Sequence, residues 1–318
     1  MENTKQERRK RVRRRRFLED EVHHIYQRTI NRFNIFYDLE DYLVYYTIFS
    51  IAARQYGVIV LGLCLMFDHI HMLIKTDARI RMSEFVRQVT CMFAREQNNE
   101  VGRKGSLFQA RFGSAPKRGL KLLRTAIAYL FNNPVEKRLC NRAEEYRWNF
   151  LAYASSPHPF SDPLIIGQAS LSLKRAVKEV DLAESEDRHL RYGQLKRLLS
   201  KLDERERMQL VDHIISIYNP FDYDEMIRCY GNYDDMLTAI NSNTGSEYDI
   251  KEDRYRFSDI EYVRMGEILH DMEGLKDLRK VTGLQIEEKM RLFEVLRKHL
   301  SCDNLPIVKF LHINLTNP

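Results

Sequence analysis

The sequence lacks the features that mark membrane and secreted proteins. No apolar run approaches the about 20 residues that a membrane-spanning helix needs, and the longest, residues 58–67, has the length of a strand. The basic N-terminus is not followed by an apolar signal core, which predicts no secretion signal. We therefore expect a cytoplasmic protein with no membrane partner.

Cysteines are few, odd in number and scattered. None of the five forms a Cys-x-x-Cys pair: they are Cys64, Cys91, Cys140, Cys229 and Cys302. This pattern indicates neither a disulfide framework nor a zinc-finger site, and it fits a reducing compartment.

Positive charge is in mild excess but unevenly distributed. The chain of 318 residues has 44% apolar and 30% charged residues and a net charge of +6, which is typical of a folded protein of about two domains. Residues 1–20 hold nine Lys or Arg, including the run Arg13–Arg16. Such a block repels itself and attracts polyanions. It predicts a flexible tail that solvates the chain, directs import or contacts nucleic acid.

The pattern of apolar residues predicts an α+β domain, an antiparallel sheet with flanking helices. Pro134 is expected to end the last helix, because proline lacks a backbone N–H and restricts the residue before it. The expected strands are residues 22–28, 58–67, 69–75 and 106–114, and the expected helices are residues 39–53, 81–99 and 120–132.

The composition divides the chain into four parts. Residues 1–20 are the basic tail, 21–155 the α+β domain, 156–163 a linker with three of the eight prolines, and 164–318 a charged, mostly helical region. In the last part, helices at 286–300 and 306–311 resemble the first half of a helix-turn-helix. A structural helical bundle is the alternative.

Four residues suggest a chemistry when they are taken together. His69 and His71 are two apart on a strand, so their imidazoles point the same way. Tyr129 and Asn133 are four apart on a helix and share a face. Two imidazoles and a carboxamide oxygen can hold a divalent cation with open positions. A tyrosine hydroxyl beside that cation can attack a phosphodiester and form a phosphotyrosine.

At these residues the sequence resembles the single-tyrosine HUH transposases, in particular the branch of REP-associated tyrosine transposases. Four segments resemble that family in the same order, and they are Met66–Ile74, Gly105–Phe112, Tyr129–Val135 and Tyr146–Trp148. The resemblance implies a ferredoxin-like HUH domain over residues 21–155 that cleaves and rejoins single-stranded or hairpin DNA in DNA transposition.

Carried over position by position, the resemblance implies that His69, His71 and Asn133 hold Mg²⁺ or Mn²⁺. Tyr129 would be the nucleophile that becomes linked to the 5′ phosphate. Asp68 stands where asparagine is more usual, and Phe131 stands where histidine is often found.

Basic and aromatic residues near these segments are candidates for DNA contacts, because phosphate contacts dominate affinity and bases stack on aromatic rings. Phe108 or Phe112 could stack on a base, although core packing is the more ordinary role. The basic candidates are Arg28, Arg111, Lys117, Arg118 and Lys121.

Two other functions fit parts of the pattern. A hairpin-binding module without catalysis, or a metal-dependent nuclease that activates water, would each leave Tyr129 dispensable. The sequence leaves open the DNA target, the role of residues 164–318, a mobile-element or host role, and whether the protein is a monomer or a homodimer.

Overall fold

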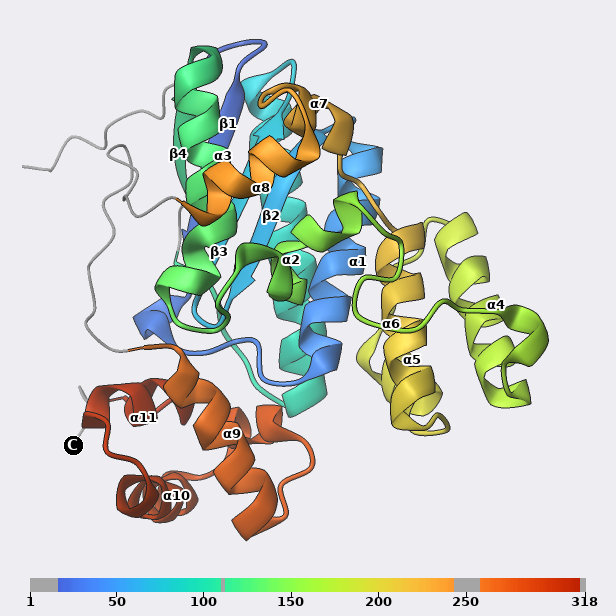
Figure 1. The fold of residues 1–318 in the computed structure, drawn as a ribbon. Helices are drawn as coiled ribbons and strands as arrows, with labels where there is room; N and C mark the ends of the chain where they lie inside the picture. Colours follow the sequence, from blue (N-terminus) through green and yellow to red (C-terminus); the bar gives the residue numbers. More distant parts are fainter. Residues whose placement is uncertain (1–16, 110–111, 243–257, 315–318) are drawn as a thin grey trace, which may run out of the picture.

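A four-stranded antiparallel sheet forms the centre of the molecule (Figure 1). The computed structural model describes residues 17–109, 112–242 and 258–314. The strands lie in the order β2-β3-β1-β4, which confirms the predicted α+β class. Their bounds are β1 (Val22–Arg28), β2 (Ile59–Met66), β3 (His69–Lys75) and β4 (Gly113–Lys117).

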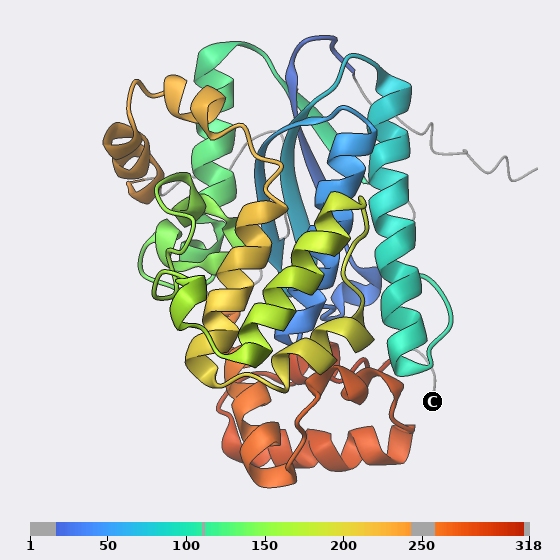
Figure 2. The same ribbon diagram turned by 90° about the vertical axis from the view of Figure 1, so that its right-hand side faces the viewer.

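Helices cover both faces of this sheet (Figures 1 and 2). Helix α3 (Gly119–Glu136) lies on one face, and α1 (Leu39–Gln55) and α2 (Arg79–Val101) lie on the other. β2 and β3 are buried almost throughout, because apolar side chains point to both helical layers. A capping box between Asp38 and Asp41 begins α1. The two carboxylates accept hydrogen bonds from backbone N–H groups that have no partner within the helix.

Two of the predicted element boundaries were wrong. The fourth strand begins at Gly113 rather than Ser106, and Phe108 makes only an isolated bridge with Thr29. The apolar side chains before Gly113 point into the hydrophobic core instead of forming a strand. Pro134 lies inside α3, which continues for two more residues to Glu136, so the proline does not end the helix where it was expected to.

The C-terminal region is mostly helical, as predicted, and packs on three sides of the sheet domain (Figure 1). Helices α4 to α6 form a layer outside α1, α7 and α8 lie near β2 and α3, and α9 to α11 form a bundle. These helices are α4 (Leu171–Ser185), α5 (Tyr192–Leu199), α6 (Glu204–Ile217), α7 (Tyr223–Arg228), α8 (Tyr233–Asn241), α9 (Ile260–Glu273), α10 (Ile286–His299) and α11 (Asn304–Phe310). No helix of the described ranges is long and apolar enough to cross a membrane.

The hydrophobic core continues across the predicted boundary between the two halves. Side chains of α1 and α2 share one cluster with side chains of α4, α5 and α6. The predicted linker is tied to this cluster, since the backbone N–H of Phe160 donates to Asp212 at 2.9 Å. The division at residues 156–163 stays a prediction, and the packing joins the first three C-terminal helices closely to the sheet domain.

The bundle of α9, α10 and α11 has its own core, which Phe67 of the β2–β3 turn completes. Most of α11 is buried in that core. After α11, His312 stacks on Phe33 at 4.5 Å, and residues 315–318 lie outside the described part of the chain. The described residues therefore fit a structural bundle, and a recognition helix is not among them.

Acidification is expected to weaken the attachment of this bundle through His312. Burial lowers the pKa of His312 to about 3, although the Asn34 carbonyl, 2.6 Å from its Nε2, favours the charged form. The pKa in the folded state lies below the ordinary value, so this stabilisation is complete above about pH 6.5 and is lost as the pH falls toward 3. Urea unfolding should show that the free energy of unfolding falls between about pH 7 and about pH 5. We expect this fall to be smaller in His312→Gln than in the parent, because glutamine does not titrate. An equal fall in both proteins would contradict this role.

Candidate active site

The site lies on the sheet face that α3 covers. In the antiparallel register, Tyr26 of β1 is opposite His71 of β3, and Arg28 is opposite His69. Because paired residues share a face and alternate residues along a strand do too, His24 lies on this face as well. The prediction that His69 and His71 point the same way is therefore confirmed.

Each of the two histidines has a hydrogen-bond partner at Nδ1. The His69 and His71 rings are 5.0 Å apart and nearly perpendicular. Nδ1 of His69 donates to the Asp68 carboxylate at 2.5 Å, and Nδ1 of His71 lies 3.0 Å from Nε2 of His24. A partner at Nδ1 fixes the ring and makes Nε2 the nitrogen that can ligate a metal.

Helix α3 brings a tyrosine against these histidines. The Tyr129 ring lies 5.7 Å from the His71 ring and 5.9 Å from the His24 ring. Tyr129 is 3% exposed. The side chain as a whole is therefore almost completely covered in this conformation.

Asn133 lies one helical turn beyond Tyr129 and is also buried. Its carboxamide oxygen has no hydrogen-bond partner within the described ranges. A buried oxygen without a partner costs about 1–3 kcal/mol, and a cation bound there would remove that cost. The donor set therefore fits a divalent metal with two imidazoles and one amide oxygen.

No group of three or more His, Cys, Asp and Glu side chains is placed to hold a metal in the part of the chain that the structure describes. His24 is thus a neighbour of the two predicted ligands and does not complete a three-histidine site. A carboxamide as third ligand is consistent with this arrangement.

The C-terminal bundle contributes charged groups at the His69 end of the site. Burial opposes the ionisation of Asp68, but the positive charges of His69, Lys309 and Arg32 outweigh it and lower the pKa of Asp68. Burial and the nearby Asp68 raise the pKa of Asp259, at the start of α9, to about 6. Sequence analysis missed Lys309 and Asp259, because they come from elements more than 100 residues away along the chain.

A second tyrosine lies on the same sheet face. The Tyr26 ring lies over Gly113 of β4, where an added Cβ would come within 2.0 Å of its ring carbons. The Arg28 guanidinium is 5.9 Å from the Tyr26 ring centre. Glycine at position 113 therefore makes the room that Tyr26 occupies.

The structure separates the basic residues predicted to bind DNA. Arg28 is half-buried on the site face, and Arg118 and Lys121 are exposed at the start of α3. Lys117 is 2% exposed, so its burial removes it from the set that can contact phosphates in this conformation. Arg111 falls outside the described residues.

The aromatic candidates for base stacking lie in the core. Phe108 and Phe112 are both buried and belong to the main hydrophobic cluster. Their packing role is confirmed, and neither ring is exposed to a base. Trp148 also packs internally, with its ring stacked 4.3 Å from that of Tyr42.

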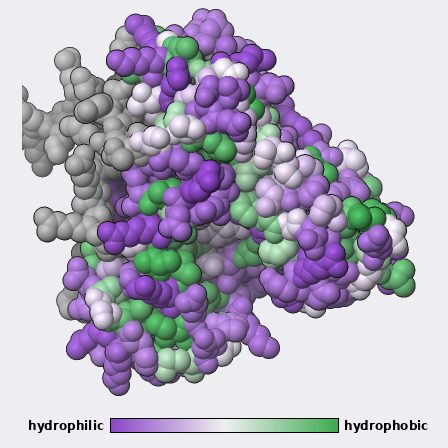
Figure 3. Space-filling view, viewed as in Figure 1, coloured by the Kyte–Doolittle hydropathy of each residue, from purple (hydrophilic) through white to green (hydrophobic). Residues whose placement is uncertain are grey.

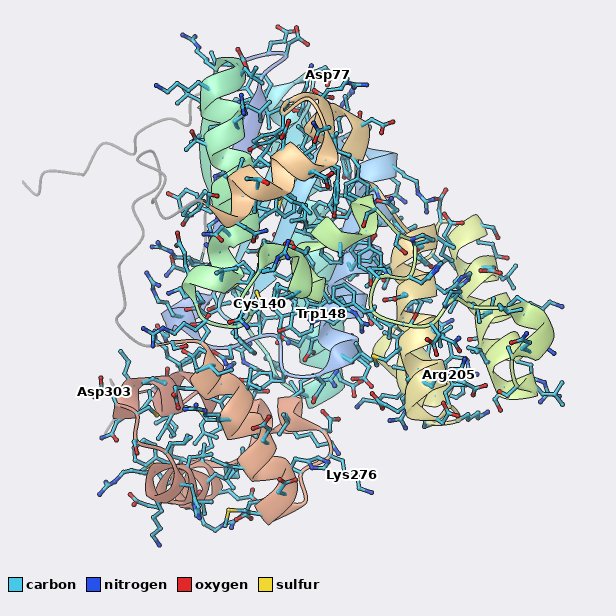
Figure 4. All side chains as sticks on the ribbon, viewed as in Figure 1. Asp77, Cys140, Trp148, Arg205, Lys276 and Asp303 are labelled. Atoms are coloured by element: carbon cyan, nitrogen blue, oxygen red, sulfur yellow. The ribbon has the colours of Figure 1, made fainter. Side chains whose placement is uncertain are left out.

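A cavity of about 500 Å³ is lined by residues of both the sheet domain and the C-terminal bundle. Figure 3 shows the hollow between these parts, and Figure 4 labels Trp148 beside it. Aromatic rings form much of its wall, while the carboxylates of Glu267 and Asp271 belong to its lining from α9. Those negative charges suit a DNA phosphate poorly, so the histidine face is the stronger candidate for the reaction.

The comparison with known families agrees with this geometry. Residues 19–133 match the sequence model of a family described as IS200-like transposases. The match falls within the part of the chain whose motifs resemble the single-tyrosine HUH transposases, and it confirms that resemblance.

A similar chain among the solved structures is titled as the structure of a REP-associated tyrosine transposase bound to a REP hairpin. The two chains are 16% identical with a TM-score of 0.38, and the match covers 44% of this chain and 82% of the other. No curated protein matches the sequence.

Proposed function

We propose that this protein is a metal-dependent tyrosine transposase that cleaves and rejoins single-stranded, hairpin-containing DNA. The proposal rests above all on one observation, the packing of Tyr129 of α3 against His71 of β3 with the ring centres 5.7 Å apart. A nuclease that activates water has no need of a tyrosine at this position, and a binding module has no need of the histidines beside it.

In the proposed reaction His69, His71 and Asn133 hold Mg²⁺ or Mn²⁺. The bound metal would polarise the scissile phosphodiester. The Tyr129 hydroxyl gives up its proton and its oxygen bonds to phosphorus, while the bond to the 3′ oxygen breaks and that oxygen takes up a proton. The product is a 5′-phosphotyrosine and a free 3′ hydroxyl. The reverse attack by a 3′ hydroxyl rejoins DNA, because the phosphotyrosine retains the bond energy.

Basic residues support a DNA substrate at this face. Arg28 borders the histidines, and Arg118 and Lys121 project from the start of α3. Each phosphate contact adds affinity that falls with salt. We propose that these three residues guide the strand toward Tyr129.

The test is a covalent-adduct assay with the full chain. Labelled single-stranded hairpins from the flanks of its own gene are incubated with Mn²⁺ or with a chelator and separated on a denaturing gel. We expect a slow-migrating labelled band that requires metal, and peptide mass spectrometry should assign the nucleotide to Tyr129. Free cleavage without an adduct would favour the nuclease, and tight metal-independent binding without cleavage would favour the binding module.

A further inference from the structure

Two adjacent histidines of β1 point to opposite faces of the sheet, and only one faces the site. Nδ1 of His23 lies 3.0 Å from the Glu21 carbonyl oxygen, and its ring stacks on Phe17 at 4.9 Å. His24 lies on the α3 face, where its Nε2 is 3.0 Å from Nδ1 of His71. His24 and His71 are both fully buried, so water does not compete for this hydrogen bond.

We propose that His24 is a positioning residue that fixes the tautomer and the ring orientation of His71. The inference rests on the proposed function, in which His71 ligates the metal. A neutral imidazole carries one N–H and one lone pair. Ligation through Nε2 requires the proton on Nδ1, and that N–H then donates to Nε2 of His24. His24 accordingly carries its own proton on Nδ1.

The opposite proton arrangement would disable His71 as a ligand. If His24 donated from Nε2, Nδ1 of His71 would accept and the His71 proton would lie on Nε2, where the metal must bind. While it makes this hydrogen bond, Nε2 of His24 does not ligate the metal that Nε2 of His71 would hold. An atom hydrogen-bonded to Nδ1 lies on the other side of the ring from a metal at Nε2.

Asp68 and His24 each fix the tautomer of one predicted ligand, Asp68 that of His69 and His24 that of His71. The Asp68 carboxylate can only accept, so it sets the tautomer of His69 directly. A neutral imidazole beside His71 achieves the same orientation without adding a further buried negative charge to those of Asp68 and Asp259. That choice matters, because a DNA phosphate has to approach this face and another carboxylate would repel it.

Metal affinity measured without DNA tests the inference. Removing the partner of a metal-bound histidine typically weakens binding 10–100-fold, so we expect His24→Leu to raise the Mn²⁺ dissociation constant by about that factor in calorimetric titration. His24→Gln can place an amide oxygen near the position of Nε2, and we expect it to restore affinity to within about threefold of the parent. His23→Leu is the matched control and should bind Mn²⁺ as the parent does.

The outcomes separate this inference from the proposed function. Parent-like affinity in His24→Leu would overturn the role of His24 alone. Absence of Mn²⁺ binding in the parent, or binding that His69→Ala and His71→Ala leave unchanged, would overturn the proposed function. If His24→Leu does not fold, ¹⁵N NMR of the histidine rings in the parent shows which ring nitrogen of His71 carries the proton. A proton on Nδ1 of His71 supports the inference, and a proton on Nε2 overturns it.

Discussion

Tyr129→Phe is expected to abolish the covalent DNA adduct, with a loss of at least about a thousandfold in the rate of its formation. Phenylalanine keeps the ring that packs 5.7 Å from His71 and removes only the attacking oxygen. Folding, Mn²⁺ affinity and hairpin binding should therefore stay close to those of the parent. The denaturing gel measures the loss of the covalent adduct. Thermal unfolding measures folding, calorimetric titration measures Mn²⁺ affinity, and a band-shift assay measures hairpin binding.

Tyr26→Phe is the matched control for this variant. Tyr26 lies on the same sheet face, opposite His71 in the register, so it is the tyrosine best placed to act if Tyr129 does not. We expect Tyr26→Phe to retain the adduct. If the adduct is lost in Tyr26→Phe but not in Tyr129→Phe, Tyr26 of β1 is the nucleophile and the assignment to Tyr129 is wrong.

Arg279→Met is expected to lower the free energy of unfolding by about 3–5 kcal/mol, the usual cost of leaving buried charges without their partner. Arg279 is 1% exposed, and its guanidinium lies 3.2 Å from Asp38 and 3.4 Å from Asp41 at the start of α1. It also lies 4.3 Å from the centre of the Tyr192 ring of α5. Burial and Asp41 already raise the pKa of Asp38 to about 7, and Arg279 opposes that rise.

Urea unfolding of the full chain at neutral pH measures this effect. Arg264→Met is a suitable control, because Arg264 is exposed and pairs with Glu261 one helical turn away on α9. An exposed pair of this kind contributes about 0.3–0.5 kcal/mol. A loss below about 1 kcal/mol in Arg279→Met would mean that the Arg279 guanidinium contributes little to holding the C-terminal bundle against α1.

The sequence by itself determined the class of the fold and the identity of the candidate chemistry. Alternation along residues 69–75 put two imidazoles on one face, and the spacing of four put Tyr129 and Asn133 together. These are local properties, because the periods of strands and helices fix which side chains share a face. The same local rules failed at Leu107 and Phe108, where burial in the core produced an apolar pattern outside the fourth strand.

Only the tertiary structure decided which distant residues complete the site. His24 is 47 residues from His71 along the chain, and their contact depends on β1 pairing beside β3. Lys309 and Asp259 reach the Asp68 end only because α9 to α11 pack on the β2–β3 turn. Lys117 looked like a surface cation, yet strand pairing buries it. Strand order and helix docking follow from the packing of the whole core, and no local period in the sequence encodes them.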